Sequence, residues 1–179
     1  MRCTPRPVLC ALLLALTLAV PAVATGEGTD ASQAFSVGLP DRPWRLWVDL
    51  PGFEMGPVRH LKGGARASGT ARAAGLAVSL TLATSPGDQS PRSCRDHDWA
   101  GRQDAQPARE DTRLSVQGDS ARVEFLVPNS EGQAVQGKHV LVYLQRDGVC
   151  AVVHLSKAHY RASDAEGLER LLASVRLGS

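Results

Sequence analysis

The sequence lacks the motifs by which several large classes of protein are recognised. Its 179 residues contain no G-x-S-x-G, no H-E-x-x-H and no Walker loop, so no common catalytic motif indicates a hydrolase, a metalloprotease or a nucleotide-binding enzyme. No long block of one charge occurs, which removes the electrostatic basis for binding the phosphates of nucleic acids. No internal repeat and no low-complexity tract is present. The informative features are an apolar leader, a strand pattern and a few cysteines.

The first 24 residues differ from the rest of the chain. MRCTPRP carries two arginines, VLCALLLALTLAV is a continuous apolar run, and the AVA at 22–24 fits the small-x-small rule before a cleavage point. This pattern predicts a signal peptide over 1–24, cleaved after Ala24, and a product exported to the periplasm or the medium. No later apolar run approaches the roughly 20 residues that cross a bilayer, so we expect no transmembrane segment after cleavage.

Two regions follow the predicted leader. Residues 25–33 are small and polar and are expected to be a flexible N-terminus, and residues 34–179 are long enough for a single domain with its own core. Both charges of the leader are basic. The 20 basic and 18 acidic residues of the whole chain therefore become 18 of each in the expected mature protein, which is neutral.

Cys94 and Cys150 are the two cysteines beyond the leader. An oxidising compartment favours their pairing, and they lack the close C-x-x-C spacing of a redox pair. We predict a structural disulfide that closes a loop of about 57 residues and stabilises the fold by about 4 kcal/mol in the chain-entropy model.

Alternating apolar residues predict most of the strands. The period of two is clear in residues 35–39, 44–50 and 76–84. Residues 51–64 are rich in proline and glycine and are expected to form a loop, while residues 65–75 are weakly patterned and predict an irregular edge strand. Around the turn at 118–119, we expect two apolar pairs to face inward in register: Leu114 with Val123, and Val116 with Ala121.

Two helices are predicted. Ser90 is a suitable N-cap with proline at the next position, and the polar segment 101–111 that follows this helix is expected to be a mobile loop. A second helix starts near Ser163, where Ser163 and Glu166 have capping-box spacing, and its apolar residues fall at 168, 171, 172 and 175. Strands followed by a helix, more strands and a helix predict an α+β domain with an antiparallel sheet.

The stretch 139–160 predicts a hairpin with Asp147-Gly148 as its two-residue turn. One face is wholly apolar and is expected to be core: Val140, Val142, Leu144, Ala151, Val153 and Leu155. The other face is too apolar for open solvent, since it carries Leu141, Tyr143 and Val152 beside its polar residues. We expect the helix from Ser90 to cover this second face, fastened to it by a Cys94–Cys150 bond.

His139 and His154 are the candidate chemical groups of that second face. They are diagonal neighbours, and with Tyr143, His97 or Asp98 they could in principle share a metal, although this spacing matches no known zinc motif. A small hydrolase site built from His154, Asp98 and a serine is the other alternative. The favoured reading is structural: two half-buried histidines under a helix, with no metal, no cofactor and no catalytic residue.

Trp47 is the candidate for surface contact. It lies on the polar side of its strand between Arg45 and Asp49. It is either an exposed anchor for a partner or a side chain packed under a helix with Arg45 over its ring, and the packed arrangement is favoured. The candidate residues for contact with a ligand or partner are Trp47, Arg45, Tyr143, His139 and His154.

Three phrases of the sequence carry a family resemblance: LPDRPWRLWVDLPGFEM, CRDHDW, and DGVCAVVHLSKAHY followed by an acidic helix ending in SVR. They are similar to small exported bacterial proteins that are mostly uncharacterised. Most of residues 34–177 resembles in outline the PsbP-like α/β/α sandwich superfamily, which implies an antiparallel sheet covered by helices on both faces. The resemblance also implies an accessory or assembly protein without catalytic residues, and it transfers no functional residue. We expect a protein that binds an unknown ligand or partner and does not bind nucleic acid.

Overall fold

The computed structural model describes residues 34–85, 90–103, 109–128 and 137–179. The predicted signal peptide over 1–24, its cleavage after Ala24 and the expected flexible segment 25–33 lie outside the described residues. Along the described chain the elements are β1 (Ala34–Gly38), β2 (Arg45–Asp49), β3 (Glu54–Met55), β4 (Arg59–Leu61), β5 (Gly64–Ala71), a 3₁₀ turn (Arg72–Ala74), β6 (Leu76–Thr84), α1 (Pro91–Gln103), β7 (Glu110–Gln117), β8 (Ser120–Val127), β9 (Gly137–Arg146), β10 (Val149–Lys157), a second 3₁₀ turn (Ala162–Asp164), α2 (Ala165–Ala173) and β11 (Arg176–Gly178).

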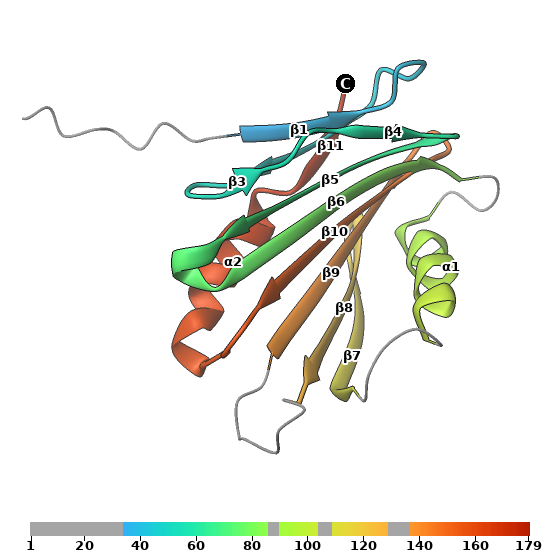
Figure 1. The fold of residues 1–179 in the computed structure, drawn as a ribbon. Helices are drawn as coiled ribbons and strands as arrows, with labels where there is room; N and C mark the ends of the chain where they lie inside the picture. Colours follow the sequence, from blue (N-terminus) through green and yellow to red (C-terminus); the bar gives the residue numbers. More distant parts are fainter. Residues whose placement is uncertain (1–33, 86–89, 104–108, 129–136) are drawn as a thin grey trace, which may run out of the picture.

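A large antiparallel sheet organises the molecule. Its strand order is β3-β5-β6-β10-β9-β8-β7, and β4 also pairs with β5 (Figure 1). A smaller sheet of order β1-β2-β11 lies beside it. The α+β class predicted from the sequence is thus confirmed.

The large sheet has two covered faces, which we call inner and outer. The inner face packs against β1, β2 and the buried residues Leu168 and Leu172 of α2 in one apolar cluster. The outer face packs against Cys94 and Trp99 of α1 in a second cluster. Figure 1 shows α1 and α2 on opposite sides of the large sheet. The sequence predicted helices alone as covering layers, whereas the inner layer is a helix together with a small sheet.

The hairpin of β9 and β10 divides these clusters residue by residue. Val140, Val142, Ala151, Val153 and Leu155 belong to the inner cluster. Leu141, Tyr143 and Val152 belong to the outer one, with Cys150 packed against it. The predicted register is confirmed at every pair. The turn has the geometry of a two-residue hairpin loop, since Asp147 and Gly148 both have positive φ angles.

The other predicted elements are confirmed in part. β2 and β6 bury the expected sides, and the register of β7 on β8 is as predicted. However, Leu114 and Val116 do not face a core: they are 50% and 46% exposed on β7, which is the edge strand of the large sheet. The alternation predicted which side of the strand they occupy but not whether anything covers it.

Three short strands are missing from the sequence prediction. The expected loop over 51–64 contains β3 and β4, both paired with β5, and the last residues form β11 beside β2. Strands of two or three residues are too short to show a period. The polar segment 101–111 is also shorter than predicted, since α1 continues to Gln103 and β7 begins at Glu110, with residues 104–108 outside the description.

Of the two predicted helix N-caps, one is confirmed and one is wrong. Ser90 caps α1 as predicted, because its Oγ accepts the Ser93 N–H at 3.1 Å. The predicted capping box of Ser163 and Glu166 is wrong. The first turn starts earlier, at Arg161, whose N–H donates to Asp164 Oδ2 at 2.8 Å.

Candidate functional site

Helix α1 is tied covalently to the outer face of the large sheet. Cys94 on α1 and Cys150 on β10 form a disulfide with their Cα atoms 5.8 Å apart, as predicted from the sequence. Arg95, the next residue, is buried and forms an ion pair with Asp96 at 2.7 Å while donating to the carbonyl of Ser115 on β7. The helix is therefore anchored near its N-terminus on two sides.

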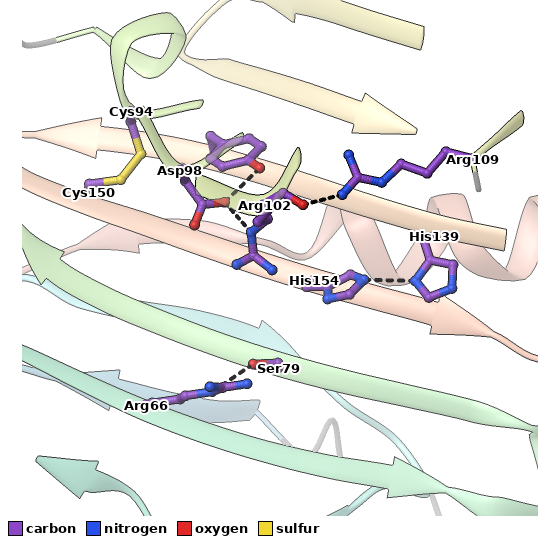
Figure 2. Close-up of polar contacts among 10 residues, drawn as sticks. Arg66, Ser79, Cys94, Asp98, Arg102, Arg109, His139, Cys150 and His154 are labelled. Atoms are coloured by element: carbon purple, nitrogen blue, oxygen red, sulfur yellow. Dashed lines mark hydrogen bonds and ion pairs between the residues drawn. A yellow bond between two sulfur atoms is a disulfide. The ribbon is translucent and has the colours of Figure 1, made fainter. Parts of the chain in front are cut away.

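A buried hydroxyl holds the middle of α1 in place. Tyr143 on β9 is fully buried, and its Oη donates to Asp98 Oδ2 at 2.9 Å. The same carboxylate oxygen accepts from Arg102 Nε at 2.6 Å, one turn further along α1. Burial and the neighbouring Asp98 carboxylate raise the pKa of Tyr143, so its hydroxyl keeps the proton that makes this bond. Figure 2 shows the disulfide, Asp98 and Arg102 following one another along the helix.

The two histidines bind each other. His139 Nδ1 and His154 Nε2 are 3.0 Å apart, so one ring donates and the other accepts. Burial, with His139 and Arg102 nearby, lowers the pKa of His154 to about 4. Burial also lowers the pKa of His139, with a contribution from Arg109. Both imidazoles are consequently neutral near pH 7, which is the state their mutual hydrogen bond needs.

An aromatic stack continues from the histidines toward β7. His139 lies parallel to Phe125 with ring centroids 4.9 Å apart, and Phe125 contacts Trp99 at 5.5 Å. The guanidinium of Arg109 lies over the Trp99 ring at 4.3 Å and donates to the carbonyl of Arg102. This edge of α1 is therefore closed by apolar packing and a cation.

The opposite edge of α1 is open. A groove with a volume of about 630 Å³ runs between this edge and strands β6 and β10. We call it the α1 groove, and its lining is Thr81, Ala83, Thr84, Ser85, Ser93, Cys94, His97, Asp98, Gly101, Arg102, Cys150 and Val152. Its floor is the disulfide and small side chains, and its wall carries the Asp98–Arg102 pair.

A second hollow, of about 850 Å³, lies beside α2. We call it the α2 hollow, and it is lined by Asp49, Pro51, Phe53, Ala71, Ala73, Ala74, Leu76, Lys157, Ser163, Asp164, Glu166, Gly167, Leu168, Arg170, Leu171 and Ser174. The α2 hollow is larger than the α1 groove, but its charged side chains are of both signs. Among the described residues, none of these side chains is fixed by a hydrogen bond from a buried side chain, as Asp98 is in the α1 groove. We regard it as the weaker candidate.

The structure brings together the residues predicted for the hairpin face and leaves the tryptophan apart. Tyr143, His139 and His154 lie in or beside the outer cluster. Trp47 lies on the small sheet and is half-buried, and the cation over its ring is Arg176 at 5.9 Å, not Arg45. Arg45 instead donates to Ser36 Oγ at 3.3 Å. These two residues belong to a different surface.

The geometry gives little support to chemistry at the histidines. Within the described ranges, no group of three or more His, Cys, Asp or Glu side chains could hold a metal ion. For a hydrolase, Ser79 is the cross-strand neighbour of His154, but its hydroxyl accepts from Arg66 at 3.2 Å, and Asp98 is bound to Tyr143 and Arg102. The nucleophile, base and acid of that alternative are therefore each engaged with other partners.

Sequence reasoning missed the arginines of this site. Arg102, Arg109 and Arg66 all act on the histidine pair or on the helix that covers it. Arg102 has i+4 spacing from Asp98, but residues 101–111 were predicted to be a loop, so this spacing gave no signal until the structure extended α1 to Gln103. Arg66 and Arg109 lie in an irregular edge strand and a polar loop, where no pattern indicates direction.

Comparison with known proteins identifies the fold. No family model matches the sequence, and no curated protein is significantly similar to it. Among solved structures, the chain is similar to the solution structure of cyanobacterial PsbP (CyanoP) from Synechocystis sp. PCC 6803. The match has a TM-score of 0.52 at 13% identity and covers 87% of this chain and 99% of that one. The PsbP-like fold expected from the sequence is therefore confirmed, and at this identity the likeness concerns the fold alone.

Proposed function

We propose that this protein is an exported, non-catalytic binding or accessory protein, and that the α1 groove is its binding site. One observation carries the proposal: contacts with the large sheet fix the side chain and the helix that form the wall of the groove. The carboxylate of Asp98 is fixed by the buried hydroxyl of Tyr143, and the helix that carries it is bonded to the floor through Cys94 and Cys150. A groove with walls held in advance loses little conformational freedom on binding.

The acid–base groups in and beside the groove favour binding over catalysis. A general base must be free to take a proton from a reacting group. His154 is instead hydrogen-bonded to His139, and Asp98 already accepts two hydrogen bonds. Groups arranged in this way stabilise a surface and present it to a ligand.

Two further points agree with the proposal. Neither helix in the described part of the chain is long and apolar enough to span a membrane. Export rests on the leader pattern of residues 1–24, and the disulfide is of the kind that persists in oxidising compartments. The PsbP-like fold is compatible with an accessory role but does not define one.

The test compares two tryptophan variants at matched helix glycines. A Cβ built at Gly101, in the α1 groove, or at Gly167, in the α2 hollow, meets no atom within 4 Å, so both positions accept a side chain. The wild-type protein and the Gly101→Trp and Gly167→Trp variants would be purified from the exported fraction of their source and examined by native mass spectrometry.

The expected result is a bound molecule or partner retained by the wild type and by Gly167→Trp and lost from Gly101→Trp. Loss from Gly167→Trp alone would move the site to the α2 hollow. Turnover of ester, phosphate or glycoside substrates that disappears in both His154→Asn and Asp98→Asn would contradict the non-catalytic function.

A further inference from the structure

The outer face of the large sheet is only half covered by α1. Helix α1 packs on β8, β9 and β10, which carry the large apolar side chains of the outer cluster. Beyond it, β5 and β6 present small and hydroxyl-bearing residues on the same face: Ser68, Thr70, Ala77, Ser79, Thr81 and Ala83. None of these requires a covering layer, so this half of the face is built to remain open.

Two arginines lie directly opposite each other on the open half. Arg59 on β4 pairs with Arg66 on β5, so both side chains lie on the outer face. Like charges at opposed positions of an antiparallel pair repel each other and destabilise the pairing. Both residues are exposed, and β4 is only three residues long. An anion bound between the two guanidinium groups would remove this repulsion.

Arg66 also connects this pair to the α1 groove. Its cross-strand neighbour on β6 is Thr81, which lines the groove, and its Nε donates to Ser79 Oγ at 3.2 Å. Within the described ranges, the two terminal nitrogens of Arg66 donate to no protein acceptor. Figure 2 shows Arg66 and Arg102 on the same side of His154, and both arginines act electrostatically on that histidine.

The charge around the groove is strongly one-sided. Among the described residues around the groove, Arg102 is paired with Asp98, which also accepts from Tyr143, whereas Arg59 and Arg66 form no ion pair. A further carboxylate on this side of β5 is that of Glu54, opposite Thr70 at the far end of the strand. For a chain whose expected mature net charge is zero, this is a local concentration of positive charge.

An apolar contact is available beside the charges. Leu61 on β4 is 62% exposed and is the most exposed large apolar side chain among the described residues. It shares the outer face with Arg59, and its partner Gly64 has no side chain between it and Ala83, which lines the groove. An oxyanion with a short organic body would meet arginine at one end and small apolar side chains at the other.

We propose that the α1 groove binds a small organic anion, a phosphate monoester or an ionised carboxylic acid, whose oxyanion is held by Arg59 and Arg66 and whose body lies against Thr81, Ala83 and Leu61. Arginine is suited to this role because its planar donors match the paired oxygens of phosphate and carboxylate. This inference rests on the proposed function, since it names the ligand class of the same groove.

The test is an NMR titration of the oxidised mature protein at low ionic strength. The probes are inorganic phosphate, glycerol 3-phosphate, succinate and uncharged glycerol, with phosphatidylglycerol vesicles in a separate co-sedimentation arm. We expect saturable shifts of the Arg66 Nε–H and of the Thr81 and His97 amides with the anions and none with glycerol. The affinity for glycerol 3-phosphate should fall about tenfold in Arg66→Gln, since a charge-assisted hydrogen bond is lost.

Two variants make the result specific. Arg59→Gln changes an exposed side chain on a short edge strand, so it should fold and weaken binding even if Arg66→Gln does not fold. Arg42→Gln, in the turn between β1 and β2, is the matched control and should bind as the wild type does. Equal affinity in all three variants, an absence of shifts with every anion, or binding to vesicles alone would overturn the proposal.

The two proposals can fail separately. If the anions do not bind but Gly101→Trp still releases the natural ligand, the groove is the binding site and its ligand is not anionic. If neither experiment detects binding in the groove, the proposed function fails with the ligand class.

Discussion

Tyr143 on β9 and Asp98 on α1 are joined by a hydrogen bond of 2.9 Å that links the covering helix to the centre of the large sheet. The donor is fully buried, and the acceptor lies at the border of the α1 groove. This single contact therefore belongs both to the packing of the fold and to the wall of the proposed site.

Replacement of Tyr143 by phenylalanine should destabilise the protein. The variant keeps the ring but leaves Asp98 with one donor fewer, so we expect the free energy of unfolding to fall by about 1–3 kcal/mol in urea denaturation. Tyr160→Phe is the control, because Tyr160 is only partly buried, with Lys138 over its ring at 5.9 Å. Its effect should stay within about 0.5 kcal/mol. Equal effects of the two variants would show that the Tyr143 hydroxyl contributes nothing specific.

Reduction of the disulfide should lower stability by about 4 kcal/mol, because it frees a long loop in the unfolded chain. Thermal unfolding with and without reductant measures this directly on the mature protein. The Cys94→Ala, Cys150→Ala double variant should match the reduced wild type and should not respond to reductant. A melting temperature that reductant leaves unchanged, or two titratable thiols in the exported protein, would contradict the bond between α1 and β10.

The histidine pair predicts that the protein loses stability on mild acidification. Burial lowers the pKa of His154 to about 4, whereas an imidazole in the unfolded chain titrates near 6.5. Between these values the unfolded chain binds more protons, so this contribution is complete above about pH 6.5 and is lost as the pH falls toward 4. The loss for His154 is on the order of 3 kcal/mol.

Urea denaturation between pH 7 and pH 5 measures this slope. The window lies above the range in which Glu169, whose pKa is lowered by Arg122, loses its charge. His154→Gln should reduce the slope and leave the part that His139 contributes, while His60→Gln, at an exposed position of β4, should not change it. A slope as steep in His154→Gln as in the wild type would assign the pH dependence to other groups.

Glycine-to-alanine substitutions should distinguish positions with room for a Cβ atom from positions without it. Gly101→Ala and Gly167→Ala should each raise the free energy of unfolding by about 0.5–1 kcal/mol, since alanine is the better helix former and its Cβ meets nothing within 4 Å. Gly69→Ala should destabilise, because its Cβ would lie 2.7 Å from the carbonyl oxygen of Glu54 on β3. Urea denaturation of the three variants gives the order, and a destabilising Gly101→Ala would show that the rim of the groove is not open.

The hairpin of β9 and β10 could be predicted residue by residue because its register depends on local information. The two-residue turn fixes the pairing, and the alternation of side chains then fixes both faces. The start of α1 was predictable for the same reason, since Ser90 and Pro91 act within one turn. The disulfide followed from having two cysteines beyond a predicted export signal.

The remaining features depend on where distant elements pack. Leu114 and Val116 lie on the predicted side of β7 but stay exposed, because β7 is the edge strand of the sheet and that position cannot be read from the strand's own sequence. The pairing of Arg59 with Arg66 depends on β4, a strand too short for a sequence period. The groove is defined by the distance between α1 and β6, which no local pattern contains.

The most direct test of the account is a crystal structure of the mature protein purified from its own exported fraction. The account predicts density for a bound molecule in the α1 groove, between Thr81 and Arg102, with the Cys94–Cys150 bond intact and the Asp98 carboxylate still on Tyr143. Density confined to the α2 hollow, or an Asp98 released from Tyr143 and aligned with His154 and a serine, would contradict it.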